Sequence, residues 1–190
     1  MASKREPSPS LRMRKIALVI YEGETEVCYI NLLKSWYKSP IRIISHIEGT
    51  KITPSLVDKR TKELKISLWD KVHTFLMYDM DVQTINEKLR KCKAEMLLSN
   101  PCFEIWLLLH AKDQKEAIET DALIKELKKS APVWKNYSKS SFTDTQKSFL
   151  NDTTDVAVAR AKDLCEFQNP STGIYKLIDL LQKNAKMVNH

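Results

Sequence analysis

The feature that most constrains this sequence is an alternation of short apolar runs with helical patterns over residues 15–111. Lys15–Tyr21 reads KIALVIY, a continuous run of apolar and β-branched residues, as in strands that are buried on both faces. Further strand-like runs follow at residues 41–47, 72–79 and 95–99, and segments with helical periodicity separate them. This alternation predicts an α/β fold with about four mainly parallel strands sandwiched by helices.

The chain divides into three parts by composition. Residues 1–14 are rich in Ser, Pro and Arg, which predicts a disordered basic leader before the α/β domain of residues 15–111. After residue 111 the strand patterns disappear, and four segments have helical patterns: residues 119–130, 143–150, 153–167 and 173–185. We therefore expect residues 112–190 to form a helical extension packed on the same domain.

The composition excludes several classes of protein. A length of 190 residues, 43% apolar and 29% charged, is typical of a globular domain and not of a disordered or membrane protein. The sequence shows no signal peptide and no run of about 18 apolar residues, so we expect a cytoplasmic protein without a membrane partner. Only 3 glycines occur, which excludes the glycine-rich loops of dinucleotide-binding and Walker A proteins. The 4 cysteines lack CxxC spacing and are expected to be reduced, mostly buried thiols.

Acidic residues follow the first and third predicted strands. Glu22 comes directly after the first strand, and Asp79 and Asp81 end the third. Because the carboxyl ends of parallel strands meet at one edge of the sheet, these three carboxylates are expected to converge there. Such a cluster repels itself unless a cation neutralises it, and Mg²⁺ prefers oxygen ligands. Gly23 would allow the sharp turn that such a site needs.

Two further acidic residues lie near the same edge. Glu26 follows the first strand closely, and Glu104 lies in the first turn of the helix that follows Asn100-Pro101. Both could bind a second ion or orient its waters. An alternative interpretation is structural, because acidic residues at helix N-termini interact favourably with the helix dipole, and Asp79 and Asp81 could cap a helix.

A substrate that carries phosphates needs positive charge, and the net charge of the chain is +7. More than half of this excess lies in residues 1–15, which have five basic residues and one acidic residue. This leader could contact phosphates or only aid solubility. The candidate nucleic-acid-binding residues in the folded part are Lys51, Lys135, Lys139 and Lys176.

Several longer motifs carry a resemblance to known proteins. They are Glu22-Gly23-Glu24-Thr25-Glu26 with Tyr29, Asp79-Met80-Asp81, SNPCFEIWLLLH at residues 99–110, Tyr137-Ser138-Lys139 and Asn169-Pro170-Ser171-Thr172. In these motifs, over about residues 15–182, the chain resembles the RloB family, also seen in the AbiLii type of phage-resistance protein. The glutamate after the first strand and the Asp-x-Asp after the third resemble the Toprim domain of topoisomerases, primases and related nucleases.

The resemblance implies a function and a set of site residues. A Toprim-like domain would bind Mg²⁺ through Glu22, Asp79 and Asp81, with Mn²⁺ as a substitute, for phosphodiester chemistry on DNA or RNA. Glu22 would complete the ion site or act as a general base. The family implies a nuclease in prokaryotic anti-phage defence by abortive infection, often encoded beside an ATPase that would be a partner.

Two alternatives remain open at the level of sequence. The chain could be a non-catalytic nucleic-acid- or nucleotide-binding subunit that regulates a partner ATPase. It could also be a receiver-like module with Asp79 as phosphoacceptor, although no fifth parallel strand followed by a lysine is apparent. Small parallel-sheet domains with helical tails often dimerise, so a homo-oligomer is also among the expected assemblies.

Overall fold

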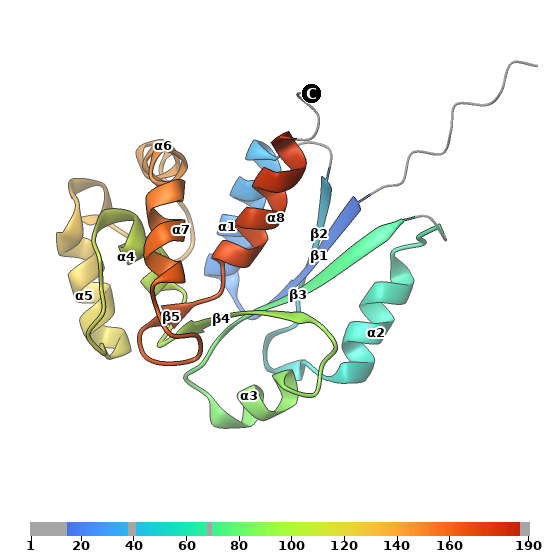
Figure 1. Ribbon diagram of the computed structural model, residues 1–190. Helices are drawn as coiled ribbons and strands as arrows, with labels where there is room; N and C mark the ends of the chain where they lie inside the picture. The colour runs from blue at the N-terminus through green and yellow to red at the C-terminus, as the bar shows by residue number, and fades with distance from the viewer. Residues whose placement is uncertain (1–14, 38–40, 68–69, 187–190) are drawn as a thin grey trace, which may run out of the picture.

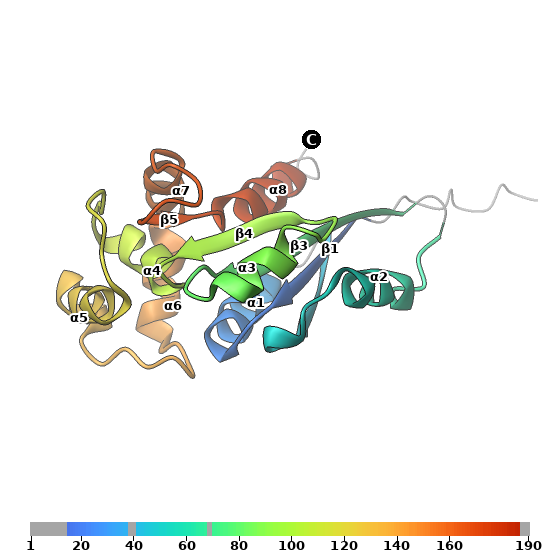
Figure 2. The same cartoon turned by 90° about the horizontal axis from the view of Figure 1, so that it is seen from below.

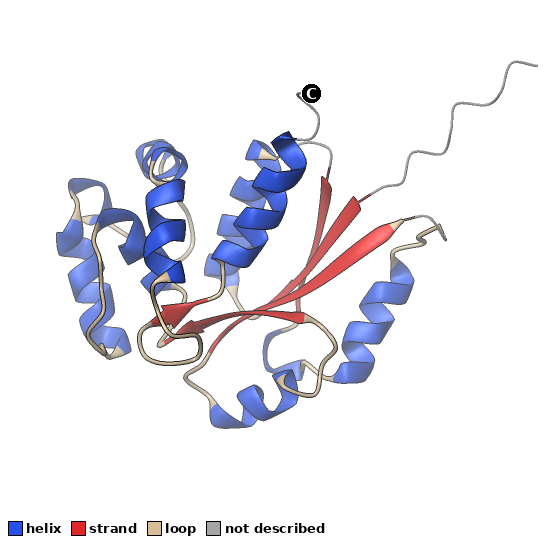
Figure 3. Ribbon diagram, in the orientation of Figure 1, coloured by secondary structure: helices blue, strands red, loops and turns tan. Residues whose placement is uncertain are grey.

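The computed structural model describes residues 15–37, 41–67 and 70–186, and the predicted leader at residues 1–14 lies outside this part. Its strands form one five-stranded sheet in the order β2-β1-β3-β4-β5 (Figures 1 and 3). The strands are β1 (Lys15–Tyr21), β2 (Ile41–Ile47), β3 (Lys71–Asp79), β4 (Glu95–Asn100) and β5 (Ser171–Thr172). The first four are parallel, and β5 is antiparallel to β4. The predicted α/β class with a mainly parallel sheet is confirmed.

Eight α-helices and two short 3₁₀ helices complete the described part of the chain. They are α1 (Glu24–Trp36), η1 (Gly49–Lys51), α2 (Pro54–Glu63), α3 (Gln83–Leu89), α4 (Glu104–Ala111), α5 (Thr120–Ser130), η2 (Pro132–Trp134), α6 (Asp144–Asp152), α7 (Thr154–Lys162) and α8 (Tyr175–Lys186). Side chains fix some of these boundaries. Thr53 caps α2 by accepting a hydrogen bond from the Leu56 amide at 3.2 Å, and Thr143 and Gln146 form a capping box at α6.

The sheet has a different apolar core on each face. Alternate residues of β1 point to opposite faces, so Leu18 and Ile20 contact the α2 and α3 side, whereas Ala17 and Val19 contact α1 and the C-terminal helices. Figure 2 shows α2 and α3 on one side of the sheet. The larger core includes α4, in which every residue from Glu104 to His110 is buried. This burial on both faces explains the continuous apolar pattern of β1.

The C-terminal helices lie beside β4 and β5 and return to the sheet through α8 (Figure 1). The sequence did not predict β5, a strand of two residues with no apolar run of its own. Gly173 follows it, and a Cβ there would lie 2.8 Å from the Met96 carbonyl oxygen of β4. The close approach of the two strands therefore requires glycine at this position.

Ring-bearing side chains of α4 and of the C-terminal extension contribute to the core. Trp134 and Tyr137 are buried, and His110 is buried with its Nδ1 2.8 Å from the Thr153 hydroxyl. All four cysteines are free, but only Cys92 and Cys102 are buried, so the expectation of mostly buried thiols holds for half of them. In the described part of the chain, no helix combines the length and the apolar character needed to cross a bilayer.

Candidate functional site

A pocket of about 280 Å³ lies at the carboxyl ends of the central strands. The acidic residues that line it come from the turn after β1, the first turn of α1, the end of β3 and the first turn of α4. Its lining consists of Glu22, Gly23, Glu24, Thr25, Glu26, Asp79, Phe103, Glu104 and Lys139. Of the three carboxylates that were expected to converge here, Glu22 and Asp79 line the pocket and Asp81 does not.

Glu22 and Asp79 are brought together by the pairing of two neighbouring strands. In the parallel register of β1 and β3, Tyr21 lies opposite Met77, so β3 continues two residues past the end of β1 and ends at Asp79. The backbone N–H of Asp79 donates a hydrogen bond to Glu22 Oε2 at 3.3 Å. This bond holds the Glu22 carboxylate against the end of β3.

The loop that carries Asp79 and Asp81 is held by its neighbours. The Met80 amide donates to the Ser99 carbonyl at 2.9 Å, and the side-chain amide of Asn86 donates to the Met80 carbonyl at 3.1 Å. Asp81 is exposed and does not line the pocket, but its charge acts on Glu22 and Asp79. The supporting role of Asn86 was not predicted from the sequence, because its burial on α3 is apparent only in the folded chain.

Glu104 is almost fully buried, with 1% of its surface exposed, and it has two partners. Its Oε1 accepts a hydrogen bond from the Tyr137 hydroxyl at 3.0 Å and lies 3.3 Å from Lys139 Nζ. The segment between η2 and α6 therefore reaches over α4 and places a lysine at the pocket. Lys139 itself remains 57% exposed, so its ammonium group is accessible to a ligand.

Crowding of these carboxylates changes their protonation. The pKa of Asp79 is raised to about 9, first by burial and then by the charges of Glu26, Glu104, Glu22 and Asp81. Burial also raises the pKa of Glu22, and nearby Asp81 adds to this effect. The pKa of Glu26 rises for the same reasons, with Glu22 and Glu104 as its acidic neighbours.

The carboxylate oxygens of the pocket are suitable ligands for a hard divalent cation, although they are not already arranged around a common point. Asp79 Oδ1 is sealed from solvent and has no hydrogen-bond partner. Four other carboxylates line the same pocket and offer oxygen atoms, the ligands that Mg²⁺ prefers, and Lys139 lies at its rim. Over the described ranges, no three His, Cys, Asp or Glu side chains are already arranged as a metal cluster. Ion binding would therefore need small movements of Glu22, Asp79 or Asp81.

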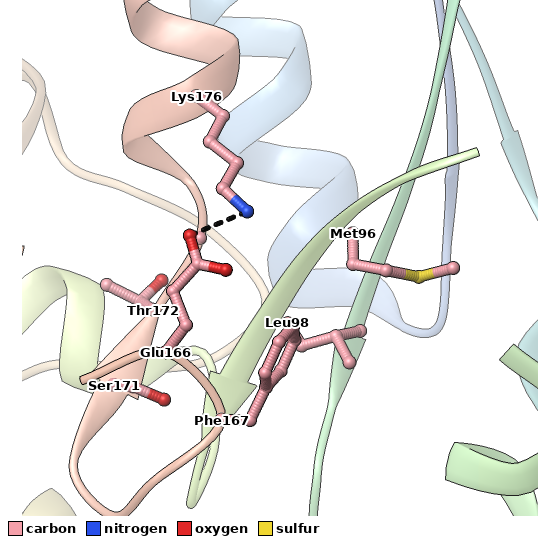
Figure 4. Close-up of a pocket in the computed structure, with 8 residues that line it drawn as sticks. Met96, Leu98, Glu166, Phe167, Ser171, Thr172 and Lys176 are labelled. Atoms are coloured by element: carbon pink, nitrogen blue, oxygen red, sulfur yellow. Dashed lines mark ion pairs between the residues drawn. The ribbon is translucent and has the colours of Figure 1, made fainter. Parts of the chain in front are cut away.

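The four lysines proposed as phosphate contacts are not all at the pocket. Only Lys139 lines it. Lys51 is exposed in η1, and Lys135 is exposed directly after η2. Lys176 forms an ion pair with Glu166 at 2.7 Å, beside a cavity of about 10 Å³ between β4 and the start of α8 (Figure 4). The structure does not bring Lys135 or Lys176 to the lining of the acidic pocket.

Comparison with protein families adds one finding. The sequence model described as RloB-like protein matches residues 17–181, which include β1 from Ala17 onward, the other four strands and the described helices up to the end of α8. No curated protein and no solved structure matches the chain.

Proposed function

Because the chain belongs to the RloB-like protein family, we propose that it is a Mg²⁺-dependent nuclease that acts in prokaryotic anti-phage defence. The acidic residues after β1 and β3 support a Toprim-like site of the kind also implied by the AbiLii resemblance. DNA or RNA is the proposed substrate, and an ATPase encoded nearby is the proposed partner.

The main support for this proposal is the Asp79 carboxyl group, which has a buried oxygen without a hydrogen-bond partner. A partly buried carboxyl group with one sealed, unpartnered oxygen is costly unless a ligand compensates for it. Four more carboxylates act on the same group, so the compensating ligand should be a cation. Glu22 and Asp79 would hold the ion with Asp81 after a small movement of the loop. Ionisable groups in a cleft whose pKa values are strongly shifted are also typical of functional sites.

The remaining residues of the pocket have roles that follow from their positions. A bound Mg²⁺ ion would polarise the phosphodiester group and stabilise the leaving oxygen. Glu22, whose pKa is raised, would accept the proton of the attacking water. Lys139, held at the rim by Glu104, would bind a phosphate oxygen of the substrate. Glu26 and Glu104 would orient water or hold a second ion.

The test is a cleavage assay with the purified chain alone. We expect it to cut DNA or RNA in Mg²⁺ or Mn²⁺ and not in EDTA. Asp79→Asn should lower the rate by at least about 100-fold, since it removes a ligand and one charge of the site. Asp163→Asn is the matched control, because Asp163 is exposed just after α7 and does not line the pocket.

Two outcomes would contradict this assignment. One is unchanged metal-dependent cleavage by the Asp79→Asn variant. The other is binding of nucleic acid without any product, in every metal tested and with the partner ATPase added. The second outcome would favour a non-catalytic binding subunit instead.

A further inference from the structure

A dense group of basic residues lies outside the acidic pocket, at the turn that joins α3 to β4. We call residues 88–93 the basic turn. Four of its six residues are basic and none is acidic: Lys88, Arg90, Lys91 and Lys93. Three of these side chains are exposed, and Lys88 is partly buried.

The basic turn has a well-defined backbone. Its two apolar residues, Leu89 and Cys92, are 1% and 7% exposed and pack in the core under the sheet. The Cys92 amide donates to the Leu89 carbonyl at 2.9 Å, and the Lys91 amide donates to the Lys88 carbonyl at 3.1 Å. The cationic side chains therefore project from an ordered backbone, so that less conformational entropy of the protein is lost when a ligand binds.

The charge of the basic turn is not neutralised within the described part of the chain. Arg90, Lys91 and Lys93 form no ion pair there, whereas Lys139 and Lys176 each pair with a glutamate. Two acidic groups lie close: Glu87 precedes the turn, and Asp58 of α2 acts on the pKa of Cys92. Neither of them makes an ion pair with the turn, so its cations are available to an external anion.

The 3₁₀ helix η1 connects the basic turn to the acidic pocket. Lys88 Nζ donates to the Thr50 carbonyl at 3.2 Å, and a Cβ on Gly49 would lie 3.7 Å from the Glu22 carbonyl oxygen. Lys51, next to Thr50 at the end of η1, is exposed and adds a further positive charge beside the basic turn. The strand β4 begins just after the basic turn, with Glu95 opposite Phe75, which lies four residues, about 13 Å of strand, before Asp79.

We infer that the basic turn, together with Lys51, binds the backbone phosphates of a double-stranded nucleic acid and leads one strand to the acidic pocket. The inference rests on the proposed function for the role of the pocket, but not for binding itself. The basic turn contains no aromatic residue, and the one large aromatic side chain that is exposed in the described ranges, Phe167, follows α7. Single-strand binding uses aromatic stacking platforms, so this surface favours a duplex.

The experiment compares two triple variants that remove the same charge. In the test variant, Arg90, Lys91 and Lys93 are each replaced by Gln. In the control variant, Lys125, Lys128 and Lys129 are replaced by Gln, because these exposed lysines lie together on α5. Affinity for mixed-sequence duplex DNA, duplex RNA and single strands is measured by fluorescence anisotropy in EDTA, so that no cleavage occurs, over a range of salt concentrations.

We expect the test variant to bind duplex about tenfold more weakly at 0.1 M salt, with the slope of log K against log salt reduced by about two to three. The control variant should change affinity by less than about twofold. A third variant with Arg90→Lys, Lys91→Arg and Lys93→Arg should bind like the parent, because it keeps every charge. Thermal unfolding of all variants checks that the fold is intact.

Three results would overturn the inference. They are equal weakening by the test and control variants, a clear preference for single strands, and binding to phosphatidylserine vesicles without binding to duplex. Cleavage assays separate this inference from the proposed function. If the parent cleaves and the test variant binds and cleaves equally well, only the inference fails. If the parent binds through the basic turn but never cleaves, only the nuclease assignment fails.

Discussion

Asp79 shows most clearly how one residue relates the fold to its proposed chemistry. Its ordinary pKa is 3.8, and burial with four acidic neighbours raises it to about 9. The folded protein therefore holds a proton at neutral pH that the unfolded chain has released. A raised pKa contributes stability that is complete below about pH 4 and is lost as pH rises towards 9. Without a cation, the pocket thus destabilises the fold at neutral and alkaline pH.

Replacement of Asp79 by Asn should therefore stabilise the ion-free protein. Asn resembles the protonated carboxyl group, so in EDTA at pH 8 the variant should gain roughly 1–4 kcal/mol in free energy of unfolding. At pH 5 the gain should be smaller, because the pH is then closer to the pKa of Asp79 in the unfolded chain and protonation of Asp79 in the folded parent costs less free energy. Urea unfolding at both pH values measures the difference. Asp81→Asn, at an exposed position, is the control and should change stability much less. Loss of stability in Asp79→Asn at pH 8 would contradict this account.

At the level of residues, the strand ends predicted the acidic side of the site. Glu22, Glu26, Asp79 and Glu104 were singled out because parallel strands present their carboxyl ends at one edge, and all four line one pocket. Asp81, singled out for the same reason, is exposed and does not line it. The contacts of Glu104 could not be predicted in this way. They depend on the position of a segment from the C-terminal extension, which no local pattern encodes.

Among the elements, the first four strands were predictable within a residue or two from their apolar runs. The helices after residue 112 were also found, although α7 ends at Lys162 and not near residue 167. The strand β5 escaped prediction, because two residues that pair antiparallel to β4 leave no periodic signal. The one sequence feature that reflects this pairing is Gly173, which follows β5 and lies too close to the β4 backbone for a side chain.

Replacement of Gly173 by Ala should weaken the junction of β4, β5 and α8. The new Cβ would lie 2.8 Å from the Met96 carbonyl and 3.1 Å from Leu97 Cα, and both are backbone atoms. We expect a loss of about 1–3 kcal/mol in free energy of unfolding, measured by urea denaturation. In the control Gly23→Ala, the new Cβ would meet only the end of the Glu26 side chain at 3.3 Å. Equal losses in the two variants would show that close strand approach is not the cause.

Over the whole molecule, ion binding, proton release and stability should be coupled. A cation that binds only the folded state stabilises it by mass action, and its binding must displace the proton of Asp79. Mn²⁺ should therefore raise the melting temperature of the parent chain, and its affinity should increase by up to about tenfold per pH unit between pH 6 and 8. Thermal unfolding with increasing Mn²⁺ at each pH provides the measurement. A shift that persists in Asp79→Asn would place the ion elsewhere.

The central claim is that carboxylates from the ends of β1 and β3 share one divalent cation. Anomalous diffraction from crystals grown with Mn²⁺ tests it most directly. We expect a single strong peak at about 2.1 Å from carboxylate oxygens of Glu22 and Asp79. A fully occupied Mn²⁺ ion elsewhere on the protein, with the Glu22–Asp79 pocket empty, would contradict it.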